Sequence, residues 1–344
     1  MFRFIVVIGE EAGNMKNITI VGCGIAGFTA AKFLRIKAPD AEVVLLDSGT
    51  HGLYSRIRLP EVLAGTLPEE KLVLSSPEAI RALGIDFRPS CEVSAIHPEQ
   101  KRLAFSGSQT LAYDTLILAT GADAALPPIQ GAEQNMTLRS LEDVQRILRQ
   151  MPDRKSATVI GGGLLGLEAA HALLQRGQKV TIIEMQPRLL PRQLSEAESA
   201  ILSRKFDELG YRVFTGRSTE SLARTADGWR IRLDDGTEFE TELILISAGI
   251  RPRAELAKAA GAQIDRGIIV DDRFATSLPD VYAIGDCAQF DGKVNGLWAA
   301  AKDQGTALAA ILAGEQEKFI SPVYEPSLKI PGIKLKEIRM AVQT

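Results

Sequence analysis

A glycine pattern that occurs twice places the strongest constraint on how this chain of 344 residues can fold. Residues 17–47 contain a short apolar run, the pattern Gly-x-Gly-x-x-Gly, a helical stretch and a second apolar run that ends in an acid. Residues 156–184 repeat these features in the same order, and their first glycine follows that of the first copy by 139 residues. Solenoid repeats have periods of only about 20–50 residues. The pattern therefore predicts two similar domains.

Each copy has the sequence context of a dinucleotide-binding strand–helix–strand unit. In the first copy, Gly22, Gly24 and Gly27 lead from a strand into a helix, and Asp47 ends the next strand. Phosphates bind the exposed N–H groups at such a helix N-terminus, and the acid accepts hydrogen bonds from ribose hydroxyls. One such turn also occurs for packing alone, but two complete copies predict two bound dinucleotides. The corresponding residues of the second copy are Gly161, Gly163, Gly166 and Glu184.

Three further apolar runs end in glycine-containing turns, which are Ala119-Thr120-Gly121, the turn at Gly249, and Gly285-Asp286. With the two repeated units, these motifs resemble, in order, the FAD-dependent pyridine nucleotide-disulphide oxidoreductases. The resemblance covers about residues 17–335. The loop 51–60 and the stretch 328–335 resemble the branch of NADH:rubredoxin reductases and nitrite reductase flavin domains.

The resemblance implies an α/β fold of the glutathione reductase type with two Rossmann-like domains. The FAD-binding domain would be discontinuous, comprising residues 15–122 and 252–325, and the NAD(P)H-binding domain would comprise residues 123–251. Residues 326–344 would form a rudimentary segment in place of the family's C-terminal interface domain, which leaves monomer and homodimer both open. Residues 1–14 are either an extra strand or sequence upstream of a start at Met15.

The resemblance also implies which residues contact the cofactors. The predicted FAD contacts are Gly22, Gly24, Ile25, Ala26, Gly27, Asp47, Arg56, Ala119, Thr120, Gly121, Gly285 and Asp286. The predicted nicotinamide dinucleotide contacts are Gly161, Gly163, Leu164, Leu165, Gly166, Glu184 and Gly249. Glu184 favours NADH, because it would repel the 2′-phosphate of NADPH, although Arg188 and Arg192 follow closely.

Two residues match positions near the flavin ring in that branch. Arg56 would lie by the isoalloxazine, and Glu168 would pair with it, so both are predicted as catalytic. Each residue also has a simpler interpretation: Arg56 as a solvated loop cation, and Glu168 as a first-turn acid that the helix dipole favours. For Asp286 the simpler interpretation is a helix N-cap. The helical stretch after Asp286, around residues 298–312, would point its positive end at the flavin.

The cysteines limit the chemistry. Cys23, Cys91 and Cys287 lie far apart, without a C-x-x-C pair, and the three histidines are equally scattered. This spacing disfavours disulfides and a Cys/His metal site, so no metal is predicted. Many family members carry redox-active cysteines near the flavin, and this sequence has none at those positions.

The predicted function is transfer of a hydride from NADH to N5 of FAD, followed by electron transfer to a small redox protein such as rubredoxin. The alternatives are the flavin subunit of a nitrite reductase, an NADH oxidase-type reductase of a small molecule, and a non-catalytic flavin sensor. Rubredoxins are acidic, so Lys329, Lys334, Lys336 and Arg339, with Arg56 and Arg58, form a candidate docking patch, which ordinary surface charge explains equally well.

Composition and hydropathy disfavour several other classes of protein. With 40 basic and 43 acidic residues the net charge is −3, which disfavours a nucleic-acid partner. No apolar run reaches the about 18 residues of a membrane span, and the short run at the N-terminus does not form a secretory signal. A cytoplasmic location is therefore expected.

Overall fold

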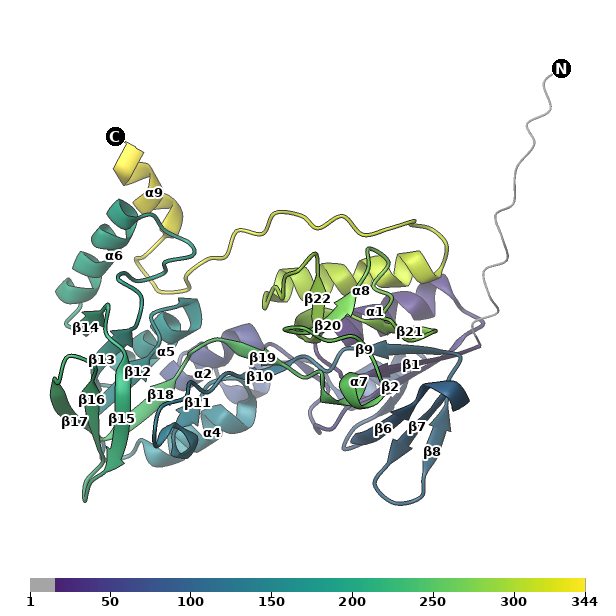
Figure 1. Ribbon diagram of the computed structural model, residues 1–344, viewed down its shortest axis with the longest axis horizontal. Coiled ribbons are helices and arrows are strands. Elements are labelled where there is room, and N and C mark those ends of the chain that lie inside the picture. The colour runs from purple at the N-terminus through teal and green to yellow at the C-terminus, as the bar shows by residue number, and fades with distance from the viewer. Residues whose placement is uncertain (1–15, 344) are drawn as a thin grey trace. The chain divides into compact units, whose positions relative to one another are not determined.

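The computed structural model describes residues 16–343, which divide into two compact units (Figure 1). The first unit contains residues 16–54, 75–122 and 252–324, and the second contains 55–74, 123–251 and 325–343. The chain passes between the units five times. Three crossings fall within strands, which are β4 (Val73–Ser75), β10 (Ala122–Ala124) and β19 (Ile250–Pro252). The other two follow β3 (Leu53–Tyr54) and Tyr324. The alternatives for residues 1–14 fall outside the described residues.

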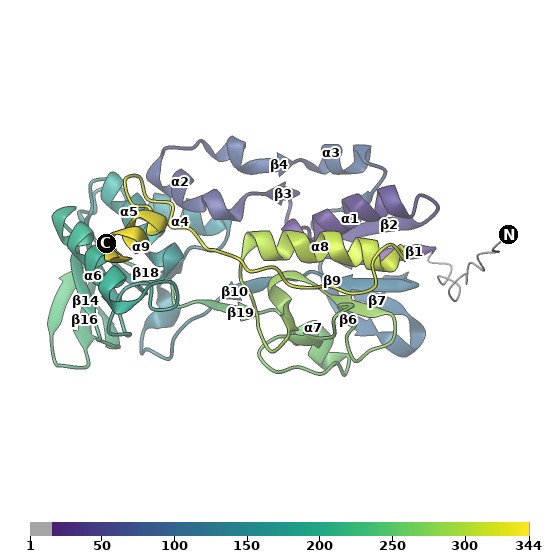
Figure 2. The same ribbon diagram turned by 90° about the horizontal axis from the view of Figure 1, so that it is seen from above.

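A five-stranded parallel sheet forms the centre of the first unit. Its strands, in spatial order, are β21 (Val281–Ala283), β9 (Thr115–Leu118), β1 (Asn17–Val21), β2 (Glu42–Leu46) and β5 (Asp86–Arg88). Its central strands are almost continuously apolar, as expected for a parallel sheet whose two faces are both covered. The helices α1 (Ile25–Lys37) and α8 (Trp298–Leu312) lie side by side on one face (Figures 1 and 2).

The second unit repeats this plan. Its parallel strands, in spatial order, are β11 (Met136–Thr137), β18 (Leu243–Ile246), β12 (Ser156–Ile160), β13 (Lys179–Glu184) and β14 (Arg212–Thr215). The helix after its glycine turn is α5 (Leu164–Gln175). Ile18 pairs with Thr115 and Val43 in the first sheet, and Ala157 pairs with Leu243 and Val180 in the second, so the two sheets share one register. The predicted α/β fold with two Rossmann-like units is confirmed.

Smaller elements complete both units. In the first unit they are α3 (Pro77–Ala82), α7 (Glu255–Ala259), the antiparallel strands β6 (Val93–His97), β7 (Arg102–Phe105) and β8 (Thr110–Ala112), and the pair β20 (Ile268–Val270) and β22 (Ala288–Phe290). In the second they are α2 (Leu59–Ala64), α4 (Leu141–Gln150), α6 (Glu196–Glu208), α9 (Leu335–Gln343) and the antiparallel strands β15 (Thr219–Arg224), β16 (Trp229–Leu233) and β17 (Glu238–Thr241).

None of the helices in residues 16–343 is long and apolar enough to cross a membrane.

Two short segments join the second unit from distant parts of the sequence. Residues 55–74, which the sequence analysis placed in the first domain, pack through α2 against α4 and α5. Residues 325–343, hereafter the tail, pack through α9 against α6 (Figure 1). Leu335 and Ile338 of α9 are buried, so ordinary apolar packing holds the tail in place.

Candidate functional site

The first glycine of each turn is required by the protein's own backbone. Gly22 has φ +111°, and a Cβ atom there would lie 2.2 Å from the carbonyl oxygen of Ala119. Gly161 has φ +122°, and its Cβ would lie 2.1 Å from the carbonyl oxygen of Ser247. L-residues with side chains rarely adopt such φ values, and the contacts are with main chain that cannot rotate away. Both positions therefore specify glycine with or without a ligand.

The second and third glycines differ from each other in the same way in both units. A Cβ on the third glycine, Gly27 or Gly166, would lie 2.0 Å from the carbonyl oxygen of the first glycine of its turn. A Cβ on the second glycine, Gly24 or Gly163, would meet no described atom within 4 Å. The second glycine thus leaves open space at the start of its helix. A pyrophosphate fits this position, because it must approach the backbone closely.

The helices that follow these turns begin without a side-chain cap. Gly24 is the N-cap of α1 and Gly163 that of α5, and neither helix has an acid in its first turn. Ile25 and Ala26 begin α1, and Leu164 and Leu165 begin α5. By contrast, α4 and α6 each start with a complete capping box. Uncapped N–H groups and the positive end of the helix dipole suit an anionic ligand.

The predicted ribose-binding acids first hold their own turns. Asp47 Oδ2 accepts a hydrogen bond of 2.5 Å from the N–H of Cys23, and Glu184 Oε2 accepts one of 2.7 Å from the N–H of Gly162. The other oxygen of each carboxylate accepts from a main-chain N–H two residues further on. A carboxylate has about four acceptor sites, so both acids keep capacity for ribose hydroxyls.

A second-unit arginine lies just beyond Glu184. Arg188 is half-buried and donates a hydrogen bond of 3.4 Å to the carbonyl oxygen of Pro191. Its Nε is buried and has no hydrogen-bond partner among the described residues. An unpartnered buried donor is costly, so this group would gain from an acceptor supplied by a ligand. Arg192 is exposed.

The other predicted flavin contacts lie at the carboxyl ends of first-unit strands. Ala119 follows β9 and packs against the glycine turn, Thr120 donates its hydroxyl to the carbonyl oxygen of Arg253 at 2.7 Å, and Gly121 has φ +72°. The N–H of Gly285 donates to Gln304 Oε1 of α8 at 2.7 Å. In the second unit, Gly249 with φ +104° follows β18, as Gly121 follows β9.

Asp286 lies in the short 3₁₀ turn Gly285–Cys287, whose N-cap is Ile284. Its side chain is half-buried, and the simpler interpretation as an N-cap is wrong. The predicted helix after it is present as α8. This helix packs against the 3₁₀ turn and begins without a side-chain cap or a first-turn acid, as an electropositive helix end requires.

Both residues that were predicted as catalytic belong to the second unit. Arg56 is half-buried in the 3₁₀ turn Arg56–Arg58, directly before α2. Glu168 is the fifth residue of α5, so its interpretation as a first-turn acid is wrong. Its side chain is only 8% exposed, and its Oε1 accepts a hydrogen bond of 2.9 Å from the main-chain N–H of Lys329 in the tail.

Burial dominates the ionisation of Glu168. Loss of water raises the pKa of its carboxyl group above the ordinary value of 4.5, while the N–H and the charge of Lys329 oppose this shift. The negative charge of Glu61 adds to it. The sequence did not indicate the contact with Lys329, because 161 residues separate the partners.

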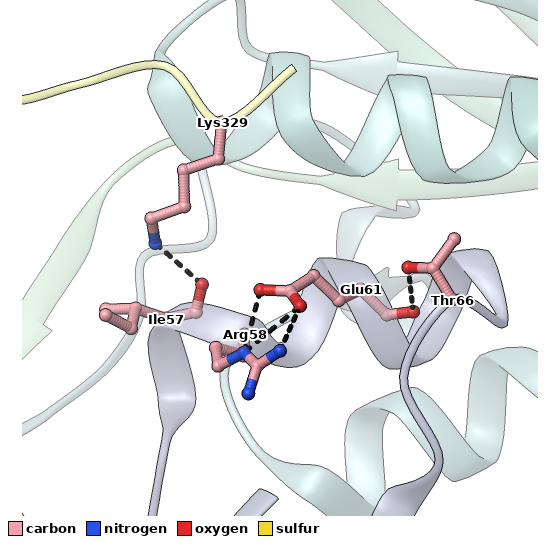
Figure 3. A network of polar contacts seen from close by, with 5 residues as sticks. All are labelled: Ile57, Arg58, Glu61, Thr66 and Lys329. Carbon is pink, nitrogen blue, oxygen red and sulfur yellow. Dashed lines mark hydrogen bonds and ion pairs between the residues drawn. The ribbon is translucent and has the colours of Figure 1, made fainter. Parts of the chain in front are cut away.

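Several cations of the predicted docking patch have partners within the second unit (Figure 3). Lys329 Nζ donates to the carbonyl oxygen of Ile57 at 2.8 Å, and Arg58 donates to Glu61 with a shortest distance of 2.6 Å. Lys334 pairs with Glu337 at 2.9 Å, and Arg339 lies 3.7 Å from Glu325. These pairs reduce the free positive charge of the patch, although Lys334 is still 74% exposed.

The thiols are poorly suited to nucleophilic chemistry. Cys23 and Cys287 are 3% and 0% exposed, and Cys91 is half-buried. Burial raises the pKa of the Cys287 and Cys91 thiols, which disfavours the reactive thiolate. Across the part of the chain that the structure describes, there is no group of three His, Cys, Asp or Glu side chains that could hold a metal ion.

The fold and the two matched turns define a protein with two dinucleotide-binding units. The pattern of the family described as pyridine nucleotide-disulphide oxidoreductase matches residues 16–305. The chain belongs to this family, which confirms the family predicted from its motifs.

Two relatives and one solved structure illustrate the similarity. The chain is 33% identical to an assimilatory nitrate reductase electron transfer subunit of Bacillus subtilis (strain 168) over 92% of its own length and 42% of that protein. It is 32% identical to the rubredoxin-NAD(+) reductase of Alcanivorax borkumensis over 92% of its length and 84% of that protein. The putidaredoxin reductase in a covalent complex with putidaredoxin has 31% identity and a TM-score of 0.82, over 87% of this chain and 75% of that one.

The length of the match differs between relatives. The chain spans 34–42% of the nitrate and nitrite reductase proteins that it matches, and 84% of the rubredoxin reductase. The activity and partners of those longer proteins therefore enter only as support for a proposal.

Proposed function

We propose that this protein binds FAD on its first unit and NADH on its second, and passes electrons from NADH to a small iron–sulfur protein such as rubredoxin. One observation carries the proposal. Both units contain a glycine turn whose first and third positions are closed by backbone and whose second position is open at an uncapped helix. This is the shape that a dinucleotide pyrophosphate needs. Similarity to a rubredoxin-NAD(+) reductase and a putidaredoxin reductase supports the kind of acceptor.

The residues divide the work between the units. In the first, Gly24 and α1 would hold the pyrophosphate of FAD, Asp47 its adenosine ribose, and Asp286 its ribityl chain. In the second, Gly163 and α5 would hold the pyrophosphate of NADH, and Glu184 its adenosine ribose. When bound, FAD would supply a group that accepts a hydride and releases electrons singly. Arg56 and Glu168 would form an ion pair that keeps a positive charge at the flavin ring.

A second candidate function is that of a flavin subunit delivering electrons to a nitrite reductase. The similarity to an assimilatory nitrate reductase electron transfer subunit, which extends over 92% of this chain, favours it. The two candidates share the donor half of the reaction and differ only in the acceptor.

One set of measurements tests the proposal. The purified protein should contain about one FAD per chain, and NADH should bleach this flavin rapidly without oxygen. Rubredoxin, nitrite with its reductase, and oxygen are then compared as acceptors. Rubredoxin reduction well above oxygen consumption is expected, whereas a flavin that NADH does not reduce would contradict an enzymatic role.

A further inference from the structure

One tail residue, Lys329, contacts both the Glu168 side chain and the main chain of the turn that carries Arg56. The main-chain N–H of Lys329 donates to Glu168 Oε1 at 2.9 Å. Its Nζ donates to the carbonyl oxygen of Ile57 at 2.8 Å, in the 3₁₀ turn that begins with Arg56 (Figure 3). A single residue therefore reaches both the carboxylate on α5 and the turn before α2.

The tail is built to hold Lys329 in this position. Its neighbours Leu328 and Ile330 are 6% and 4% exposed, while Lys329 itself is exposed. The two buried neighbours anchor the main chain on both sides of Lys329, whose own side chain stays exposed. The buried residues of α9 anchor the tail again beyond this point.

The 3₁₀ turn and α2 depend on Lys329 at one end only. At the other end of α2, Arg176, which follows α5 directly, donates from Nε to the carbonyl oxygen of Leu63 at 2.8 Å. Gln145 of α4 donates to Glu69 at 2.7 Å just beyond α2. Loss of the lysine side chain should therefore free the turn that carries Arg56 without undocking the whole segment 55–74.

We propose that Lys329 is a positioning residue, which holds the Glu168 carboxylate through its main chain and its charge, and the Arg56 turn through its side chain. This inference rests on the proposed function, because it assigns Lys329 to the Arg56–Glu168 pair. Through Lys329, the tail thus contributes to the proposed Arg56–Glu168 pair within the second unit.

The charges around Glu168 determine in which direction Lys329 shifts the pKa of its carboxyl group. Lys329 favours the carboxylate, and Glu61 of α2 disfavours it. Arg56 is the proposed ion-pair partner. Beneath α5, the ionisable residues of β12 and β13 are Lys179 and Glu184, at the two ends of β13. With Lys329 neutralised, the effects of burial and Glu61 on the carboxyl group are less opposed, so its pKa should rise.

The test compares Lys329→Met with Lys329→Arg in the full-length holoprotein. Carboxyl ¹³C NMR follows the titration of Glu168, whose signal is assigned by its absence in Glu168→Gln. Lys329→Met should move the titration to higher pH and slow anaerobic flavin reduction by NADH about two- to tenfold, the value of one hydrogen bond. Lys329→Arg should retain both properties, because it keeps the charge and the donors.

Two controls separate positioning from general damage. Lys179→Met removes an exposed lysine of the same unit and should change neither property. Lys329→Met in the Glu168→Gln background should slow reduction less than in the wild type, because residues that act together are not additive. Wild-type titration and reduction in Lys329→Met would overturn the inference. If NADH reduces no variant, the proposed function fails, and the Glu168 titration alone decides whether Lys329 acts on this carboxylate.

Discussion

The glycine turns of the two dinucleotide-binding units are packed against main-chain carbonyl groups in the same way. A Cβ on the first or third glycine would lie 2.0–2.2 Å from a carbonyl oxygen in both units. An acid at or directly after the end of the second strand of each unit accepts a hydrogen bond from an N–H of the turn. The units differ at the residue between the first two glycines. It is Cys23 in the first unit and Gly162 in the second, where a Cβ would lie 2.7 Å from Leu189 and 2.9 Å from the Cβ of Glu184. The longer acid and its following loop close over the second turn.

The helices after the turns differ more deeply. Thr29 of α1 and Glu168 of α5 occupy equivalent positions, and both are buried. Thr29 faces α8, which comes close because Gly305 has no side chain; a Cβ there would lie 2.4 Å from the carbonyl oxygen of Ala26. Glu168 instead meets the tail at Lys329. The same helix face therefore serves packing in one unit, and we propose that it serves chemistry in the other.

The largest effect is expected where the two units agree. Gly22→Ala and Gly161→Ala should each lower the free energy of unfolding by about 2–4 kcal/mol, because they add backbone strain and overpacking. Chemical denaturation of the cofactor-free protein measures this loss. If either variant were as stable as the wild type, a Cβ at the first glycine would not clash with the main chain as we expect.

The middle glycines should distinguish the units by cofactor. In Gly24→Ala and Gly163→Ala the added Cβ meets no atom of residues 16–343 within 4 Å, so stability should change little. Each added methyl group should obstruct one pyrophosphate and weaken its binding about ten- to a hundredfold, as expected for a lost charged hydrogen bond. FAD content should fall only in Gly24→Ala, and NADH affinity only in Gly163→Ala. The reverse pattern would exchange the proposed cofactors between the units.

The sequence predicted the part of the molecule that local rules determine. Glycine spacing, apolar strands and terminal acids follow from neighbouring residues, and they led to the fold class and the family. The contact of Glu168 with Lys329 and the grouping of residues 55–74 with the second unit depend on tertiary packing between distant segments. No local pattern carries that information. The first-turn interpretation of Glu168 failed because α5 begins only at Leu164.

Substitutions at the equivalent positions Thr29 and Glu168 test whether this helix face takes part in catalysis only in the second unit. Glu168→Gln should slow flavin reduction by NADH about tenfold, by removing the proposed charged partner of Arg56. In the wild type the rate should fall as the pH drops through the raised pKa of Glu168, and Glu168→Gln should lose this limb. Thr29→Val should leave the pH profile unchanged. Stopped-flow reduction across the pH range measures all three proteins.

Glu184 and Asp47 should affect different cofactors. Glu184→Gln removes the charge that would repel a 2′-phosphate and leaves Arg188 nearby, so preference for NADH over NADPH should fall about fivefold. The matched change Asp47→Asn should leave this preference unaltered and lower FAD content instead. The ratio of kcat/KM for the two donors measures the preference. An unchanged ratio in Glu184→Gln would remove this acid from donor selection.

The smallest effect is expected at the tail's exposed lysines, where the second unit would meet an acidic acceptor. Lys334 is largely exposed but already paired with Glu337, so it offers only part of its charge. Exchanging Lys334 and Lys336 for Glu should raise KM for rubredoxin about two- to threefold at low salt, as expected for rim charges. NADH affinity should not change, because the substitutions lie outside the glycine turn. An unchanged KM would exclude docking at these lysines, while an equal rise at high salt would indicate damage to α9 instead of lost attraction.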